Sequence, residues 1–256
     1  MVPLRRLTAL AIASALVGCG AASTDATAPA ASRTLRVGFD RPNGLITNEY
    51  AIYSGGPGRH VSPTWIATSG SLFAHDRQGW TGRPDAVSPD ACSCKSTDSS
   101  IFRVVTRRHD FADVAVSFTL TNQRLVSTRK TPAIPLDGVH VFLRYRSPQD
   151  LYVVSVNRRD HTVVVKKKLP GGHSNGGHYI QLGQPARWDW HFGAVQHVRA
   201  GVRTLGPQRV VITLMVDGNK LLDVVDSHDP LVAPGRVGLR GDNDQFLFDD
   251  FTARPL

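Results

Sequence analysis

The residues of this chain best suited to ligand chemistry are aromatic, and two of them are almost adjacent. Trp188-Asp189-Trp190-His191 would place both indole rings on one face of an extended segment, with an acid between them. Trp80 stands apart, in a predicted Gly-Trp-Thr-Gly loop. Sugar rings stack on aromatic faces, so Trp80, Trp188 and Trp190 are candidate glycan platforms. The alternative is that these tryptophans cover the edge of a core.

A second group of polar residues alternates with apolar residues along two predicted strands. His140, Phe142 and Arg144 would share one face of the first strand, and Tyr152 and Arg158 belong to the next. Histidine, tyrosine and arginine offer hydrogen bonds and positive charge to sugar hydroxyl and carboxylate groups. We therefore expect a glycan site on the concave face of a sheet, with Trp188 and Trp190 at its rim.

Acidic residues are few, which limits hydrolytic chemistry. Most glycoside hydrolases flank the scissile bond with two acids, but Glu49 is the only glutamate here and has no evident partner at strand spacing. The aspartates favour a calcium site instead, because Asp40 follows the first predicted strand while Asp249 and Asp250 lie in the last. The other role open to these aspartates is to accept hydrogen bonds from turn amides. The alternative calcium ligands are Asp242 and Asp244.

The N-terminus predicts export and a lipid anchor. Arg5 and Arg6 precede an apolar run that is too short for a transmembrane helix. The run ends in Leu-Val-Gly-Cys19, which is similar to the lipobox of bacterial lipoproteins, where the cysteine becomes the lipidated first residue. We expect residues 1–18 to be a signal peptide and residues 19–33 a lipidated cysteine and flexible linker. An ordinary secretory signal with a chance cysteine is the alternative.

A lipidated Cys19 would attach the protein to the cell membrane, facing the extracellular or periplasmic side. The membrane is then one partner, and nucleic acid is not expected as another. The chain carries 30 Lys and Arg against 21 Asp and Glu, a net charge of +9. Loss of Arg5 and Arg6 leaves 28 against 21, a net +7. This charge suits an acidic polysaccharide, although a solvated basic surface would also explain it.

Cys92 and Cys94 are the two other cysteines of the chain. An exported domain favours a disulfide between them. A single intervening residue would make the ring small and strained. A strained local disulfide and free thiols therefore stay open as alternatives.

Strand-like runs fill the chain after the linker, and no amphipathic helix is evident. Gly235–Arg240 and Gln245–Phe251 flank a Gly-Asp-Asn-Asp turn, and such a closing strand should pair with the first strand, Thr34–Phe39. Asp217-Gly218-Asn219 predicts a hairpin. A Ser-Gly pair predicts a second hairpin. It joins residues 64–67 to residues 71–74. About a dozen strands without a compositional boundary predict one antiparallel two-sheet sandwich over residues 34–256.

Four segments of this domain carry a family resemblance: VTRRHDFADVAVSFTL, GVHVFLRYRSPQDLYVVSVNRRDHTVVVKKK, VVITLMVDGNKLL and PGRVGLRGDNDQFLFDDFTARPL. In order and spacing they resemble the concanavalin A-like lectin/glucanase superfamily, which includes LamG-like jelly-roll domains. The resemblance covers roughly residues 34–256 and implies an all-β jelly-roll sandwich. It leaves the activity open, because this superfamily includes lectins, glycosidases, polysaccharide lyases and adhesion modules.

The resemblance also raises two enzymatic alternatives. Laminarinase-like hydrolases of the superfamily use a Glu-x-Asp-x-x-Glu strand, which this chain lacks. Its polysaccharide lyases use Tyr, His, Arg and Gln to take a proton beside a uronate and to neutralise the carboxylate. His178, Tyr179 and Gln181 are of the right types, but the lysine and glycine of the lyases' Tyr-Lys-x-Gly-x-Tyr-x-Gln block are missing.

Together these patterns predict a monomeric cell-surface lipoprotein whose β-sandwich recognises a glycan. The enzymatic alternative is a lyase acting on an acidic glycan, which the residues favour over a glycoside hydrolase. A surface scaffold without a ligand is the third reading.

Overall fold

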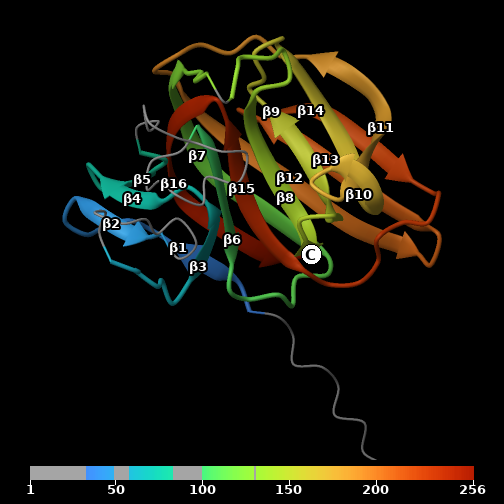
Figure 1. The fold of residues 1–256 in the computed structure, drawn as a ribbon. Helices are drawn as coiled ribbons and strands as arrows, with labels where there is room; N and C mark the ends of the chain where they lie inside the picture. The colour runs from blue at the N-terminus through green and yellow to red at the C-terminus, as the bar shows by residue number, and fades with distance from the viewer. Residues whose placement is uncertain (1–32, 49–57, 83–99, 130) are drawn as a thin grey trace, which may run out of the picture. The chain divides into compact units, whose positions relative to one another are not determined.

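The computed structural model describes residues 33–48, 58–82, 100–129 and 131–256. Every regular element in these ranges is a β-strand. Among the described residues, no helix is long and apolar enough to cross a membrane. Sixteen described strands form two antiparallel sheets (Figure 1). The all-β sandwich predicted from the sequence is confirmed. The predicted sites outside the described ranges are Cys19, Glu49, Cys92 and Cys94.

The two sheets differ in size and composition. The nine-stranded sheet runs in the order β14 (Asn219–Asp226), β13 (Arg209–Val216), β12 (Val195–Gly206), β7 (Val114–Leu125), β16 (Asp244–Pro255), β5 (Gln78–Trp80), β4 (Leu72–His75) and β2 (Gly44–Thr47), with β1 (Leu35–Val37) also paired to β16. The seven-stranded sheet runs in the order β11 (Gly177–Arg187), β10 (Thr162–Ser174), β9 (Asp150–Val156), β8 (Gly138–Ser147), β15 (Arg236–Asp242), β6 (Ile101–Thr106) and β3 (Trp65–Ser69).

The closing strand is where the sequence places it. β16 pairs with β1, with Val37 opposite Phe251, so the prediction that the last strand joins the first is confirmed. The hairpin predicted at Asp217 and Gly218 is also confirmed, because both residues have the left-handed φ (49° and 78°) that a tight turn between β13 and β14 requires.

The second predicted hairpin is wrong. β3 pairs with β6 in the seven-stranded sheet, whereas β4 pairs with β2 and β5 in the nine-stranded sheet. The connection through Gly70, whose φ is 66°, therefore crosses between the sheets. A two-residue Ser-Gly link looks alike in sequence whether it closes a hairpin or bridges two layers.

The core lies between the sheets and is filled by alternate residues of each strand. In β9, Tyr152, Val154 and Val156 face the core, so Val153 points to the opposite, outer face. A bulge at Asp250, with φ of 52°, shifts this alternation in β16 and keeps Phe251 in the core. Because side chains alternate along each strand, every second residue of the seven-stranded sheet lies on its outer face, away from the core.

Candidate functional site

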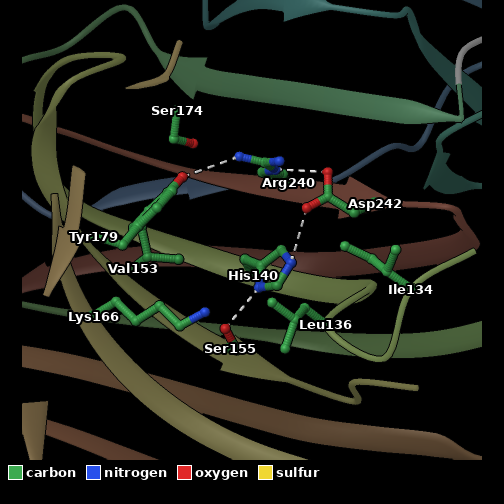
Figure 2. A pocket seen from close by; sticks show the side chains of 10 residues that line it. All are labelled: Ile134, Leu136, His140, Val153, Ser155, Lys166, Ser174, Tyr179, Arg240 and Asp242. Atoms are coloured by element: carbon green, nitrogen blue, oxygen red, sulfur yellow. Dashed lines mark hydrogen bonds and ion pairs between the residues drawn. The ribbon is translucent and has the colours of Figure 1, made fainter. Parts of the chain in front are cut away.

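A cavity of about 250 Å³ opens on the outer face of the seven-stranded sheet (Figure 2). Five neighbouring strands, β8, β9, β10, β11 and β15, contribute side chains to it. Most of its polar groups are therefore fixed on a rigid sheet rather than on loops. The lining residues are Ile134, Leu136, His140, Val153, Ser155, Lys166, Ser174, Tyr179, Arg240 and Asp242.

Five of these side chains form one continuous polar chain, visible as the dashed line in Figure 2. Arg240 donates to the Tyr179 hydroxyl at 3.3 Å and to an Asp242 oxygen at 2.7 Å. The other Asp242 oxygen lies 3.2 Å from Nε2 of His140, whose Nδ1 lies 2.8 Å from the Ser155 hydroxyl. Every member of the chain has its position fixed by its neighbours.

The strand register explains why these residues meet. Arg240 is directly opposite His140 across β15 and β8, and His140 is opposite Ser155 across β8 and β9. Asp242 lies two residues beyond Arg240 on the same strand and so shares its face. Tyr179 joins from the edge strand β11, where it is opposite Lys168.

Burial and charge shift the ionisation of this polar chain. Burial alone would raise the pKa of Asp242, but Arg240 and His140 hold that pKa well below its ordinary value. Burial lowers the pKa of His140, and the neighbouring Asp242 only partly opposes this. The carboxylate of Asp242 is thus charged and already engaged, while His140 favours its neutral form.

Cations crowd the Tyr179 end of the cavity. The ammonium groups of Lys166 and Lys168 lie 5.7 and 4.9 Å from the centre of the Tyr179 ring. Burial, followed by Arg240 and Arg103, lowers the pKa of Lys168 to about 8. The pKa of Lys166 is also lowered, first by burial and then by Arg158 and Arg240.

Arg144 is not on this face, so the prediction that it shares a face with His140 is wrong. Its φ of 48° marks a bulge in β8, which turns Arg144 into the interior of the sandwich. There it is fully buried and donates to Asp113 at 2.8 Å and to Thr204 at 2.7 Å. Phe142 stays on the outer face, where it stacks on Tyr145.

Tyr152 is a second predicted contact that lies in the interior. It is fully buried, donates to Asp226 at 2.7 Å and accepts a hydrogen bond from the Leu231 amide at 2.8 Å. Burial and the hydrogen bond to Asp226 raise its pKa. Tyr152 cannot contact a glycan without disruption of the core, because its side chain faces the opposite sheet.

The predicted residues Arg158 and Trp190 meet at the border of the site. Arg158 is 4% exposed and donates to Asp160, while its carbonyl accepts a hydrogen bond of 3.0 Å from the Trp190 indole. Trp190 is 5% exposed and stacks on His161. Trp188 is half-buried against the core cluster. The alternative reading, in which these tryptophans cover a core edge, fits this placement.

Trp80 lies on the other sheet. It is part of β5 in the nine-stranded sheet, where its indole donates to Gln123 at 2.9 Å. Its ring packs 4.8 Å from the ring centre of His75. The predicted grouping of Trp80 with the other glycan-binding residues is therefore not observed.

Of the three predicted lyase residues, only Tyr179 lines the cavity. Tyr179 and Gln181 share a face of β11, and His178 points to the other face because side chains alternate along a strand. Gln181 lies outside the lining and donates only a 3.4 Å hydrogen bond to the Gly183 carbonyl. His140 takes the place that the sequence assigned to His178.

Arg240 and Ser155 are site residues that were not predicted from the sequence. The alternation of Arg240 and Asp242 in the closing strand was an available signal, because two opposite charges at that spacing share a face. Ser155 had no such signal, since an isolated serine within a strand is common. Its place depends on the pairing of β8 with β9.

The calcium prediction concerns the edge where β1 meets β16. Asp40 is paired there with Arg77 at 2.8 Å. Burial, Asp250 and Asp40 raise the pKa of Asp249. In the part of the chain that the structure describes, no three acidic, histidine or cysteine side chains form a group that could hold a metal. Asp242 is engaged by Arg240 and Asp244 by Asn122, so calcium stays a prediction from the sequence.

Comparison with known proteins identifies similar folds but does not identify the activity of this chain. No family model and no curated protein matches the chain. A carbohydrate-binding module from Bacillus subtilis, CBM66, aligns with a TM-score of 0.50 at 13% identity over 74% of this chain and 94% of that one. A Bacillus subtilis protein of unknown function with a galectin-like fold aligns with a TM-score of 0.51 at 11% identity over 74% and 88%. Both are similar in fold, which supports the two-sheet jelly-roll sandwich.

Proposed function

We propose that this protein binds a glycan in the cavity on the outer face of the seven-stranded sheet. The observation that carries the proposal is the fixed chain of polar groups from Tyr179 through Arg240 to His140. Ligand sites combine a concave apolar lining with a few oriented polar groups, and here Ile134 and Leu136 supply the apolar side. The fold likeness to a carbohydrate-binding module is compatible with this proposal.

Retention on immobilised polysaccharides tests the proposal. The chain should be retained on at least one polymer of a panel of neutral and uronate polysaccharides, and Tyr179→Ala should abolish the retention. His178→Ala is the matched control, because His178 is the adjacent residue on the same strand but points away from the cavity. Loss of retention in the control alone, or retention unchanged by Tyr179→Ala, would show that the site lies elsewhere.

A second candidate function is a lyase reaction on a uronate-containing glycan. The observation that favours it is that Tyr179, Arg240 and His140 line one cavity, and that burial lowers the pKa of His140 and so favours its neutral imidazole. Such an enzyme neutralises the carboxylate, removes the neighbouring proton and protonates the leaving oxygen. Tyr179→Phe separates the two functions: it should remove the ultraviolet absorbance of an unsaturated product but preserve retention on the polymer.

We also propose, from the sequence, that the chain is a lipoprotein carried on the outer side of a membrane through Cys19. The short apolar run that ends at this cysteine supports the proposal. Metabolic labelling with a fatty acid should mark the wild-type chain and not Cys19→Ser. Equal labelling of both would contradict lipidation at Cys19.

A further inference from the structure

We infer that the cavity is selective for a ligand that carries a carboxylate or sulfate group, which binds between Lys166 and Arg240 beside Tyr179. This inference rests on the proposed function and adds the charge of the ligand to it. Lys168, whose ammonium lies 4.9 Å from the centre of the Tyr179 ring, and Arg103, which is opposite Arg240, add positive potential to this position.

The strand register brings like charges together on the outer face. Arg103 is directly opposite Arg240 across β6 and β15, and like charges opposite one another destabilise a sheet. Lys166 and Lys168 are two residues apart on β10 and so share the outer face. All four side chains surround the Tyr179 end of the cavity.

The available carboxylates compensate these cations only in part. Asp242 is shared by Arg240 and His140, and Asp160 is taken by Arg158. Among the described residues, no carboxylate forms an ion pair with Lys166, Lys168 or Arg103. Lys168 is only 2% exposed, so water screens its charge poorly. The face thus has an excess of buried positive charge, and a bound anion would remove it.

Ionisation supports this reading. Burial and the facing cations Arg240 and Arg103 lower the pKa of Lys168 to about 8, and burial with Arg240 also lowers the pKa of Arg103. Tyr179 from β11 and Lys166 from β10 complete the surroundings of the Lys168 ammonium. A bound anion favours the protonated form of Lys168, so binding should take up protons near pH 8 and weaken as the pH rises above it.

Matched polymers test the inference. The wild-type chain should bind a polyuronate or a sulfated polysaccharide at least about tenfold more tightly than the carboxyl-reduced or unsulfated counterpart. The two charged arms distinguish a carboxylate from a sulfate. Affinity for the preferred polymer should fall between pH 8 and 10. Equal binding of charged and neutral counterparts would overturn the inference and leave the proposed function intact.

Variants locate the charge effect. Lys166→Met should weaken binding about tenfold and Lys168→Met a few-fold, because one charge contacts the anion and the other acts through space. Lys220→Met, an exposed residue of the other sheet, removes the same charge and should change affinity less than about twofold. An equal loss of affinity in all three variants would attribute the effect to net charge alone. It would overturn the proposed anion subsite between Lys166 and Arg240. Thermal unfolding checks that each variant is folded.

A failure of the proposed function can be recognised separately. If the wild-type chain binds none of the polymers, glycan binding is contradicted, and inorganic sulfate then probes the subsite alone. A rise in the pKa of Lys168 on sulfate addition, followed by NMR of the lysine side chains, supports the subsite. An unchanged pKa overturns it.

Discussion

Lys167 and Lys168 are neighbours on β10, yet their side chains lie in two opposite electrostatic environments. Lys167 points into the sandwich and is 1% exposed, with its ammonium 3.0 Å from an Asp226 oxygen and near the carbonyls of His228 and Asp229. Lys168 points outward and is 2% exposed. It lies beside the Tyr179 ring and the cations Arg240 and Arg103, and among the described residues it forms no ion pair with a carboxylate. The difference teaches that a buried charge is not always part of a stabilising ion pair. Asp226 neutralises the charge of Lys167, whereas no carboxylate in the described part of the chain pairs with Lys168.

The largest expected effect comes from breaking the compensation in the interior. Asp226→Asn leaves the Lys167 ammonium buried without a counter-charge, and loss of one partner of a buried pair costs about 3–5 kcal/mol. The free energy of unfolding, measured in urea, should fall by that amount. Asp223→Asn, which removes an exposed partner of Lys220 on the same strand, should change it by less than about 1 kcal/mol. Similar losses in both would erase the distinction between the two environments.

Arg144 provides the second interior test. Arg144→Met removes buried hydrogen bonds to Asp113 and Thr204, but Asp113 is 31% exposed and can be rehydrated. We expect a loss of about 2 kcal/mol in the free energy of unfolding. Retention on a glycan should be unchanged, because Arg144 faces the core. If Arg144→Met is stable but is no longer retained on the glycan, then Arg144 does take part in binding.

The outer lysine should respond with the opposite sign. Lys168→Met keeps most of the side-chain volume and removes an uncompensated buried charge, so the free energy of unfolding should rise by about 1 kcal/mol at pH 7. Lys167→Met should lower it, because Asp226 is then left buried without a counter-charge. The pair of variants differs by one position in the chain. Destabilisation by both would show that Lys168 has a structural partner.

The smallest effect is a dependence on pH. The pKa of Lys168 is about 8 in the folded chain and 10.5 in its ordinary state, so the unfolded chain binds more protons between these values. Stability from this group therefore rises as the pH increases from about 8 to about 10.5. The rise should vanish in Lys168→Met. Measurement of unfolding at several pH values checks both the sign and its assignment.

The fold follows from features that the sequence displays openly. Alternating apolar residues predict the strands, as in β6 (Ile101–Thr106) and β13 (Arg209–Val216). Asp217 locates the hairpin between β13 and β14. Asn243 also has a left-handed φ, but its turn leads from β15 in the seven-stranded sheet to β16 in the nine-stranded sheet. Sheet membership was harder, because the link at Gly70 carries no sign of whether it joins neighbours in one layer or in two.

The site was only partly predictable, for a physical reason. His140 and Tyr179 were identified because polar residues within strands stand out. Arg144 was misplaced because a bulge reverses the face of every later residue, and no residue type announces it. Arg240 was missed because its role depends on Tyr179, which is distant in sequence and adjacent only after folding.

The pairing of β1 with β16 has a consequence for the order of the strands along the chain. Leu35 lies opposite Ala253, so the two ends of the sandwich meet on one sheet. A short linker from Leu256 to Arg33, with new ends opened between Asp217 and Gly218, would give a circularly permuted chain. Such a chain would preserve every strand pairing of both sheets. The connectivity of this sandwich can then be changed without a change in its architecture.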